Sequence, residues 1–202
     1  ADVTVCTLFL CHFSFILYLC IAMNDEKSTS LSPYRRGADA GFFFGVYLCV
    51  IFFATAYSLD VPFLGFFSFL LLIGVPVFIY VSLRRSYLAD HGTTIFSSLW
   101  MEGIATFFFG GIISALVAVV YMRFVNPHFI NEQIDTMISI YNQADWERGK
   151  ELADILTRAR EQKLIPRPVE FAINMLWLIV FSGSILSMLM SLLVQARGYK
   201  KR

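Results

Sequence analysis

Charged residues are scarce in this chain of 202 residues: 15% of them are Asp, Glu, Lys or Arg, and 57% are hydrophobic. Soluble domains usually carry about 25% charged residues. The composition therefore excludes a soluble globular protein, a disordered chain and a disulfide-rich scaffold. The net charge is only +1, so the chain lacks the basic excess that neutralises phosphates, and we expect no nucleic acid partner. The sequence predicts an integral membrane protein of one domain.

Motifs for catalysis, cofactors and metals are also missing. There is no P-loop and no G-x-S-x-G, H-E-x-x-H or G-x-G-x-x-G pattern. The histidines are scattered, no C-x-x-C pair occurs, and all the cysteines fall inside apolar runs: Cys6, Cys11, Cys20 and Cys49. We therefore expect no cofactor, no metal and no catalytic residues, and we interpret the protein as a non-enzyme.

Long uncharged runs are what the chain does contain. A helix needs about 20 apolar residues to cross a bilayer core, and continuous runs predict helices rather than barrel strands. The runs are Val3–Ala22, Ala40–Leu59, Val61–Leu83, Ile104–Met122 and Met175–Val194. The predicted fold is an all-α membrane protein with a four-helix transmembrane bundle over residues 40–195.

Residues 1–22 leave three interpretations open. They form an extra hydrophobic N-terminal helix, a signal peptide without a clear cleavage site, or upstream translation before a true start at Met23. Residues 23–39 follow as a polar tail, which the third interpretation makes a free cytoplasmic N-terminus.

Basic residues predict the orientation of the four spans. Cytoplasmic ends of membrane helices are enriched in Lys and Arg, and four spans from Ala40 onward bring all the basic clusters to one side. These clusters are Arg35 and Arg36, Arg84 and Arg85, and the tail of residues 196–202 with Arg197, Lys200, Lys201 and Arg202. We expect a bacterial inner-membrane protein with both termini cytoplasmic if the chain starts at Met23.

Small residues recur at helical spacing in three of the spans. Such stripes let helix backbones approach closely in lipid. The stripes are Gly37, Gly41 and Gly45; Gly110, Ser114 and Ala118; and Gly183, Ser187 and Ser191. They predict either packing within one bundle or the seam of a homodimer.

Glu102 is the one charged residue within a span-length segment. If the third helix starts at Thr94, Glu102 lies about 12 Å along it, where a buried acid is costly and is a functional candidate. In that case Ser97, Ser98 and Thr106 lie on nearby turns and complete a polar intramembrane site. The neighbouring Trp100 favours the other interpretation, in which Glu102 lies at the cytoplasmic headgroups.

The loop before this helix contains Asp90-His91-Gly92. An Asp–His pair can transfer protons, but adjacent positions in a loop are weak evidence for catalysis. We expect Thr93 or Thr94 to cap the next helix.

Residues 126–167 depart from the membrane pattern. Asn126-Pro127 predicts the end of the third span. Two amphipathic helices follow, with apolar residues at helical spacing, and Asp154 and Glu151 are expected to pair with Arg158. This periplasmic hairpin caps the bundle, lies in the membrane interface or binds another protein.

The combination of features resembles a known family. The resemblance rests on four segments: Arg35-Arg36-Gly37 before a glycine-rich first span, Arg84-Arg85 after the second span, Asn126-Pro127-His128-Phe129-Ile130 after the third, and Pro166-Arg167-Pro168 before the last. Over about Gly37 to Arg197 the chain resembles an uncharacterised family of Bacteroidota inner-membrane proteins, domain of unknown function four-one-nine-nine. The resemblance implies a multi-pass membrane location and no activity, ligand or site residues.

Three functions remain open from the sequence. The favoured one is a non-enzymatic component that assembles or stabilises a membrane complex, with the lipid bilayer and a membrane-protein partner or a homo-oligomer around it. The alternative is a small oligomeric transporter or channel that uses Glu102. The third is a membrane enzyme that would need Asp90, His91 and Glu102 to converge in a pocket.

Overall fold

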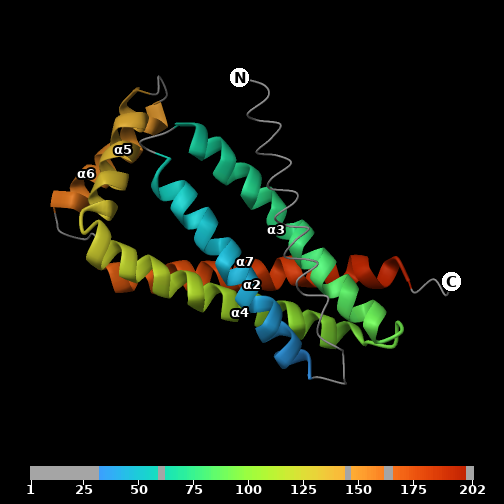
Figure 1. Cartoon of the computed structure of the whole chain (residues 1–202). Helices are drawn as coiled ribbons and strands as arrows, with labels where there is room; N and C mark the ends of the chain where they lie inside the picture. Colours follow the sequence, from blue (N-terminus) through green and yellow to red (C-terminus); the bar gives the residue numbers. More distant parts are fainter. Residues whose placement is uncertain (1–31, 59–61, 144–146, 162–165, 199–202) are drawn as a thin grey trace. The chain divides into compact units, whose positions relative to one another are not determined.

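The computed structural model describes residues 32–58, 62–143, 147–161 and 166–198, and within these residues it contains helices and no strand. Residues 1–22, where an extra helix was one interpretation, lie outside them. The helices are α2 (Pro33–Ala56), α3 (Pro62–Ala89), α4 (Phe96–Val120), α5 (Phe129–Gln143), α6 (Glu147–Glu161) and α7 (Pro168–Ala196), and a π-helical turn at Tyr121–Val125 extends α4 (Figure 1). The predicted all-α fold, including the helical hairpin between the third and fourth spans, is confirmed.

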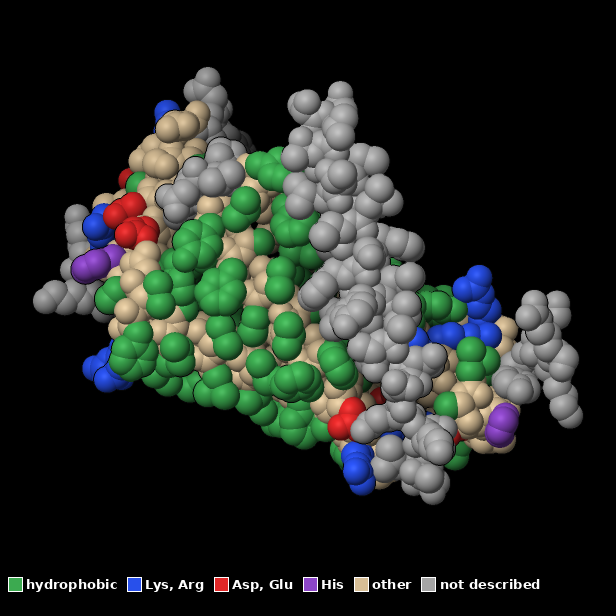
Figure 2. Space-filling model, in the orientation of Figure 1, with side chains coloured by type: hydrophobic (Ala, Val, Ile, Leu, Met, Phe, Trp, Pro, Cys, Tyr) green, Lys and Arg blue, Asp and Glu red, His purple; other side chains and the backbone are tan. Residues whose placement is uncertain are grey.

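Four of the helices are long and apolar enough to cross a membrane. They are Pro33–Ala56, Phe63–Ala89, Phe96–Val125 and Pro168–Ala196. On the face shown in Figure 2, hydrophobic side chains gather in a broad area. The chain is a multi-pass membrane protein, whereas the identity of the membrane and the side of each terminus stay predictions.

The chain divides into two compact units. Unit 1 holds the described residues up to Ser114 and those from Leu176 onward, and unit 2 holds Ala115–Met175. Unit 1 therefore contains α2, α3, most of α4 and most of α7, while unit 2 contains α5, α6 and the remaining ends of α4 and α7.

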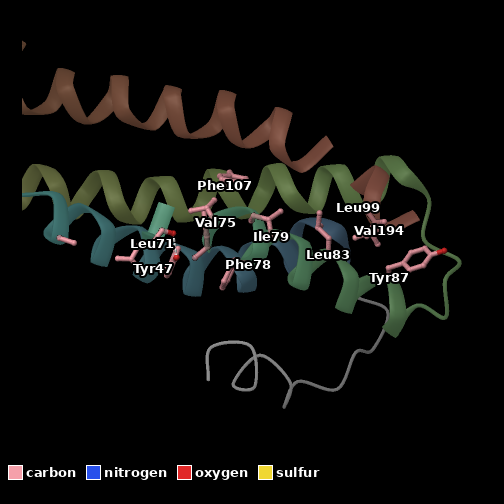
Figure 3. Packing of buried hydrophobic residues seen from close by; sticks show 12 residues of the cluster. Tyr47, Leu71, Val75, Phe78, Ile79, Leu83, Tyr87, Leu99, Phe107 and Val194 are labelled. Carbon is pink, nitrogen blue, oxygen red and sulfur yellow. Dashed lines mark hydrogen bonds between the residues drawn. The ribbon is translucent and has the colours of Figure 1, made fainter. Parts of the chain in front are cut away.

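Aromatic side chains form the centre of the unit 1 core. Phe44 on α2 packs against Phe78 of α3 and Phe107 of α4, with ring centroids 5.5 Å and 4.9 Å away. Tyr47 is fully buried beside them, and its hydroxyl donates a hydrogen bond of 2.5 Å to the carbonyl of Leu71. Buried tyrosines need such an acceptor, so this bond ties α2 to α3 at one position (Figure 3).

The rest of this core comes from all four helix segments of unit 1. Its other buried members are Ala54, Leu71, Val75, Ile79, Leu83, Tyr87, Leu99 and Val194. Figure 3 shows Leu99 and Val194 close to the Leu83 end of α3. Unit 1 is thus a bundle with a continuous apolar interior.

Helix α2 begins at Pro33, earlier than the apolar run that starts at Ala40. Proline suits the first helical position because its fixed φ is already helical and the missing N–H has no intrahelical partner there. The carbonyl of Ser32 accepts from the amides of Arg35 and Arg36. The last part of the predicted polar tail is therefore the first two turns of a membrane-length helix.

Helix α3 ends in a left-handed turn. Gly92 N–H donates to the Tyr87 carbonyl over 2.9 Å, and His91 N–H donates to the Leu88 carbonyl over 3.1 Å. This pair of bonds is the Schellman arrangement, which places the residue before the last donor in the left-handed region. That residue is His91, with φ of 53°, where glycine is the usual occupant.

The expectation that Thr93 or Thr94 caps α4 is wrong. The first amides of α4 donate to the carbonyl of Ile95. The Thr93 hydroxyl donates to the Asp90 carbonyl and the Thr94 hydroxyl to the Asp90 carboxylate, each over 2.7 Å. Both threonines therefore stabilise the turn before α4 rather than the start of the helix.

Unit 2 is built around the α5–α6 hairpin, whose helices lie side by side. Asn126 organises its entrance: its Oδ1 accepts from His128 N–H over 3.0 Å, and its Nδ2 donates to Glu132 over 2.7 Å. Arg160 of α6 forms an ion pair with Asp135 of α5. This ion pair joins the two helices of the hairpin. The predicted pairing of Arg158 with Asp154 and Glu151 within α6 does not form among the described residues.

Candidate functional site

The side chain of Glu102 is almost completely buried, with 2% of the residue exposed. Ser86 of α3 donates a hydrogen bond to one carboxylate oxygen, Oε1. The second oxygen, Oε2, is buried and has no hydrogen-bond partner among the described residues. Glu102 therefore joins α3 to α4 through one oxygen and leaves the other oxygen available.

Glycine positions α2 against this part of α4. A Cβ added to Gly37 would lie 2.7 Å from the Glu102 carbonyl oxygen and 2.5 Å from the Ala105 Cβ. These distances are too short for any side chain, so the backbones touch here because residue 37 is glycine. The contact places the first turns of α2 beside Glu102.

The neighbouring charges form an ion pair. Arg36 Nη1 of α2 lies 2.7 Å from Asp90 Oδ2, and the two side chains are 18% and 29% exposed. Partial burial acts to raise the pKa of Asp90, but hydrogen bonds from Thr94 and Arg36 and the charge of Arg36 outweigh it and hold the pKa below its ordinary value. Asp90 is therefore an ionised partner of Arg36 at neutral pH.

Arg36 and Asp90 also act electrostatically on Glu102, with opposite signs. Because their effects oppose each other, the pair does not supply Glu102 with a dedicated counter-ion. Arg85, next to Ser86 on α3, has a buried Nη1 that lacks a hydrogen-bond partner among the described residues. The groups that act on the buried acid are therefore Ser86 and the Arg36–Asp90 pair.

The structure brings together some of the residues that the sequence singled out and separates others. Thr106 is 1% exposed and donates to the Glu102 backbone carbonyl over 2.9 Å. Ser98 belongs to the first turn of α4, where its N–H donates to the Ile95 carbonyl. Asp90 lies with Glu102 in the cluster, but the exposed His91 occupies the left-handed turn.

A metal site is not formed by the described acids, histidines and cysteine, since no three of them lie close enough to share an ion. The depth of Glu102 in the membrane stays a prediction. The structure buries the Glu102 side chain within the protein, which is compatible with either depth.

The first glycine stripe faces α4 inside unit 1. Cβ atoms added to Gly41 and Gly45 would lie 2.8 Å from the Phe109 Cβ and 2.9 Å from the Ile113 Cβ. Gly110 lies opposite, with the backbone of Gly41 and Gly45 about it. These contacts use the stripe for packing within one chain.

The third stripe faces the other side of α4. Gly183 lies against the Phe107 ring, and Gly103 lies against the Ser187 side chain. Ser187 and Ser191 are completely buried, and their hydroxyls lack a hydrogen-bond partner among the described residues. Ser114 and Ala118 of the second stripe are also buried.

The residues used to predict orientation have several different roles. Arg35 is exposed, and Arg36 is paired. Arg84 Nη1 donates to the carbonyls of Val194 and Gly198, over 3.2 Å and 2.9 Å, and so satisfies the C-terminal end of α7. Lys200 and Lys201 lie outside the described residues.

Sequence reasoning missed Ser86 and the link between Arg36 and Asp90. Ser86 directly follows Arg84-Arg85, and its position one helical turn before Asp90 was the available signal. The partner of Asp90, however, lies 54 positions earlier in the chain. No local pattern reports such a pairing.

Comparison with known proteins gives a family without an assigned activity. A family model described as "Protein of unknown function (DUF4199)" matches residues 39–196. No curated protein and no solved structure matches the chain.

Proposed function

This chain belongs to the DUF4199 family, and from that premise we propose that it is a non-enzymatic component that assembles or stabilises a membrane complex. The observation that carries the proposal is the apolar surface of the α5–α6 hairpin. It consists of Met137, Ile140, Leu152 and Ile155, which are 48%, 58%, 40% and 54% exposed. We call these four residues the hairpin patch.

The packing of α5 against α6 leaves the hairpin patch uncovered. Ala153 is the most buried apolar residue of α6, and Ile134 and Ile138 of α5 are half-buried. Met137 and Leu152 lie on the two helices that the sequence predicts to be amphipathic, yet their side chains remain exposed. Exposed apolar side chains on a helix that is otherwise polar favour a partner surface.

The geometry near Asp90 supports the non-enzymatic part of the proposal. The Asp90 carboxylate accepts from Arg36 and Thr94, each over 2.7 Å. Both donors bond to the same carboxylate oxygen, Oδ2, and these contacts give Asp90 a structural role in the turn between α3 and α4.

Site-specific photo-crosslinking in native membranes tests the proposal. A photoreactive amino acid is placed at Ile140 and, separately, at Ile155. Control positions are Asn142 and Glu151, which are exposed polar residues of the same helices. We expect both apolar positions to give one protein adduct of the same mass, and the control positions to give little of it.

A second substitution makes the test specific. Ile155→Glu places a charge in the hairpin patch, and we expect it to abolish the adduct formed from position 140. Glu151→Lys changes charge outside the patch and should leave the adduct in place. Adducts with lipid alone would show that the patch lies in the membrane interface and would refute the assembly role.

The alternative function is a small oligomeric transporter or channel, and the burial of Glu102 is the observation that favours it. Its test is the flux of protons or monovalent cations across proteoliposomes that contain the full chain. We expect Glu102→Gln to abolish a flux carried through this residue. Equal flux in the wild type, the variant and empty liposomes would eliminate this function.

A further inference from the structure

The carboxyl group of Glu102 has an unusual set of neighbours for a membrane helix. Its Oε1 accepts from the Ser86 hydroxyl. Its Oε2 is buried and has no donor among the described residues, and only 2% of the Glu102 residue is exposed. An ionised carboxylate normally collects several donors, because leaving a charged oxygen without a partner away from water is costly.

Charged groups around Glu102 do not remove this cost. From α2, Arg36 acts on it electrostatically, but the Arg36 Nη1 is bonded to Asp90 of the α3–α4 turn, and the buried Arg36 Nε has no hydrogen-bond partner among the described residues. Arg85 on α3 is adjacent in sequence to Ser86 and has a buried Nη1 without a partner among the described residues. From α7, the uncharged Ser187 lies against Gly103 of α4, one residue after Glu102.

A divalent metal ion does not fit the oxygen atoms present. Calcium takes about six to eight oxygen ligands and magnesium about six. Among the described residues, Glu102 and Ser86 are the side chains joined at this point, and the Thr106 hydroxyl is already bonded to a backbone carbonyl. The nearby Arg36 guanidinium further disfavours a second cation. A proton needs one oxygen lone pair, which Oε2 supplies.

We propose that the Glu102 carboxyl is an exchangeable proton-binding site in the membrane bundle. The proton resides on Oε2, while Ser86 donates to Oε1, and its release regenerates the carboxylate. Exchange with solvent occurs at the end of the helices where Arg36 and Asp90 are part exposed. The site lies in unit 1 and does not depend on the hairpin patch, so it goes beyond the assembly role.

Infrared spectroscopy of the full chain in lipid nanodiscs tests this site. The chain is labelled with ¹³C at the glutamate side-chain carboxyl, and the C=O stretching band of the protonated acid is followed from about pH 4 to pH 9. Exposed glutamates ionise around pH 4.3. We expect one labelled band to persist above that range, to disappear reversibly as the pH rises, and to shift in D₂O.

Two variants assign the band. Glu102→Gln should abolish it, and Glu170→Gln, which alters an exposed glutamate of α7, should leave it unchanged. Glu102→Asp keeps a carboxyl but removes the label from this position, so it should also abolish the labelled band. This second variant keeps the assignment intact if the glutamine variant does not fold.

The neighbouring charges predict how the titration midpoint moves. Asp90→Asn leaves the positive charge of Arg36 unopposed, so the midpoint should shift to lower pH by about one unit or more. Arg36→Gln leaves Asp90 unopposed, so the midpoint should shift to higher pH. Arg85→Gln should move the midpoint little, because Arg85 is not among the groups that act electrostatically on Glu102.

Three results would overturn the proposal. The first is the absence of any labelled band above the range in which exposed glutamates ionise. The second is a band that neither titrates nor shifts in D₂O, which would make Glu102 a permanently neutral structural group. The third is a band that survives in both Glu102 variants.

Discussion

Arg36 of α2 and Asp90 of the α3–α4 turn form an ion pair of 2.7 Å across 54 positions of the chain. The pair ties the start of the first described helix to the connection between the next two. Thr94 donates to the same Asp90 oxygen, so one carboxylate oxygen serves two segments. The position of the α3–α4 turn relative to α2 therefore depends on the charge of Asp90.

Acidic pH should weaken the ion pair between Arg36 and Asp90 in a defined pH window. Since the pKa of Asp90 in the folded chain lies below its ordinary value of 3.8, its contribution to stability is present above that value and is lost as the pH falls through the folded pKa. We expect Asp90→Asn to cost about 1 kcal/mol or less at neutral pH, because the pair is partly exposed. Thermal unfolding in detergent at pH 7 and pH 3 measures both effects.

The same measurement on Asp39→Asn is the control, because Asp39 is an exposed residue of α2. Its stability should follow the pH dependence of the wild type, whereas Asp90→Asn should show a flatter dependence. An equally steep acid loss in Asp90→Asn would mean that another group is responsible.

Gly41→Ala should separate α2 from α4. The added Cβ would lie 2.8 Å from the Phe109 Cβ and 3.1 Å from the Thr106 carbonyl oxygen. Neither atom is the end of a flexible side chain, so the helices themselves must shift. We expect a loss of about 1–3 kcal/mol, measured by unfolding in mixed micelles.

Gly65→Ala is the matched control, because a Cβ there would meet only the Ser58 Cβ, at 3.6 Å. Alanine favours the helix over glycine by up to about 1 kcal/mol, so this variant should be neutral or stabilised. Similar losses for Gly41→Ala and Gly65→Ala would contradict close packing of α2 on α4.

Ser187→Ala should not destabilise the chain. The Ser187 hydroxyl is completely buried and has no hydrogen-bond partner among the described residues. Removing an unsatisfied buried hydroxyl is neutral or stabilises by about 1 kcal/mol. Ser187→Val, in contrast, should destabilise, because Gly103 lies directly against this side chain.

Ser182→Ala serves as the reference for a serine on the same helix, since Ser182 is exposed and bonds to the Leu178 carbonyl within α7. Its stability should match that of the wild type. A loss of about 2 kcal/mol or more in Ser187→Ala alone would show that this hydroxyl has a partner after all.

Asn126→Ala should loosen the entrance to the hairpin. The substitution removes the acceptor for His128 N–H and the donor to Glu132. Each such bond contributes about 0.5–1.5 kcal/mol. We expect faster amide hydrogen exchange in the first turns of α5, with unchanged exchange in α3. Asn142→Ala, at an exposed position near the end of α5, should not change the exchange of those first turns.

The architecture was largely predictable because it follows from one-dimensional patterns. Uncharged runs of span length give the four long helices, and the change to a mixed polar pattern after Asn126 gives the hairpin. Helix ends were less predictable. The uncharged run predicts a first span from Ala40, whereas α2 begins at Pro33, because proline suits the first helical position.

The site was predictable only in part. Glu102 stands out as an acid inside an apolar segment, and the glycine stripe indicates a close helix contact. Whether the Glu102 side chain faces lipid or the bundle interior depends on the rotation of α4, which is set by contacts with α2 and α7. Similarly, the π-helical turn at Tyr121–Val125 has no local signature, since it arises at the end of an otherwise regular apolar helix.

Two adjacent glycines make α4 unusually sensitive to its own length. Gly110 approaches the backbone of α2, while Gly111 meets Leu176 and Ile179 of α7. One inserted or deleted residue before Gly110 would turn everything beyond it by about 100° relative to the preceding turns. The α2–α4 contact and the α4–α7 contact would then both lose the glycine that allows the close approach. Within a family that keeps this packing, variation in chain length should therefore collect in the connections and avoid the middle of α4.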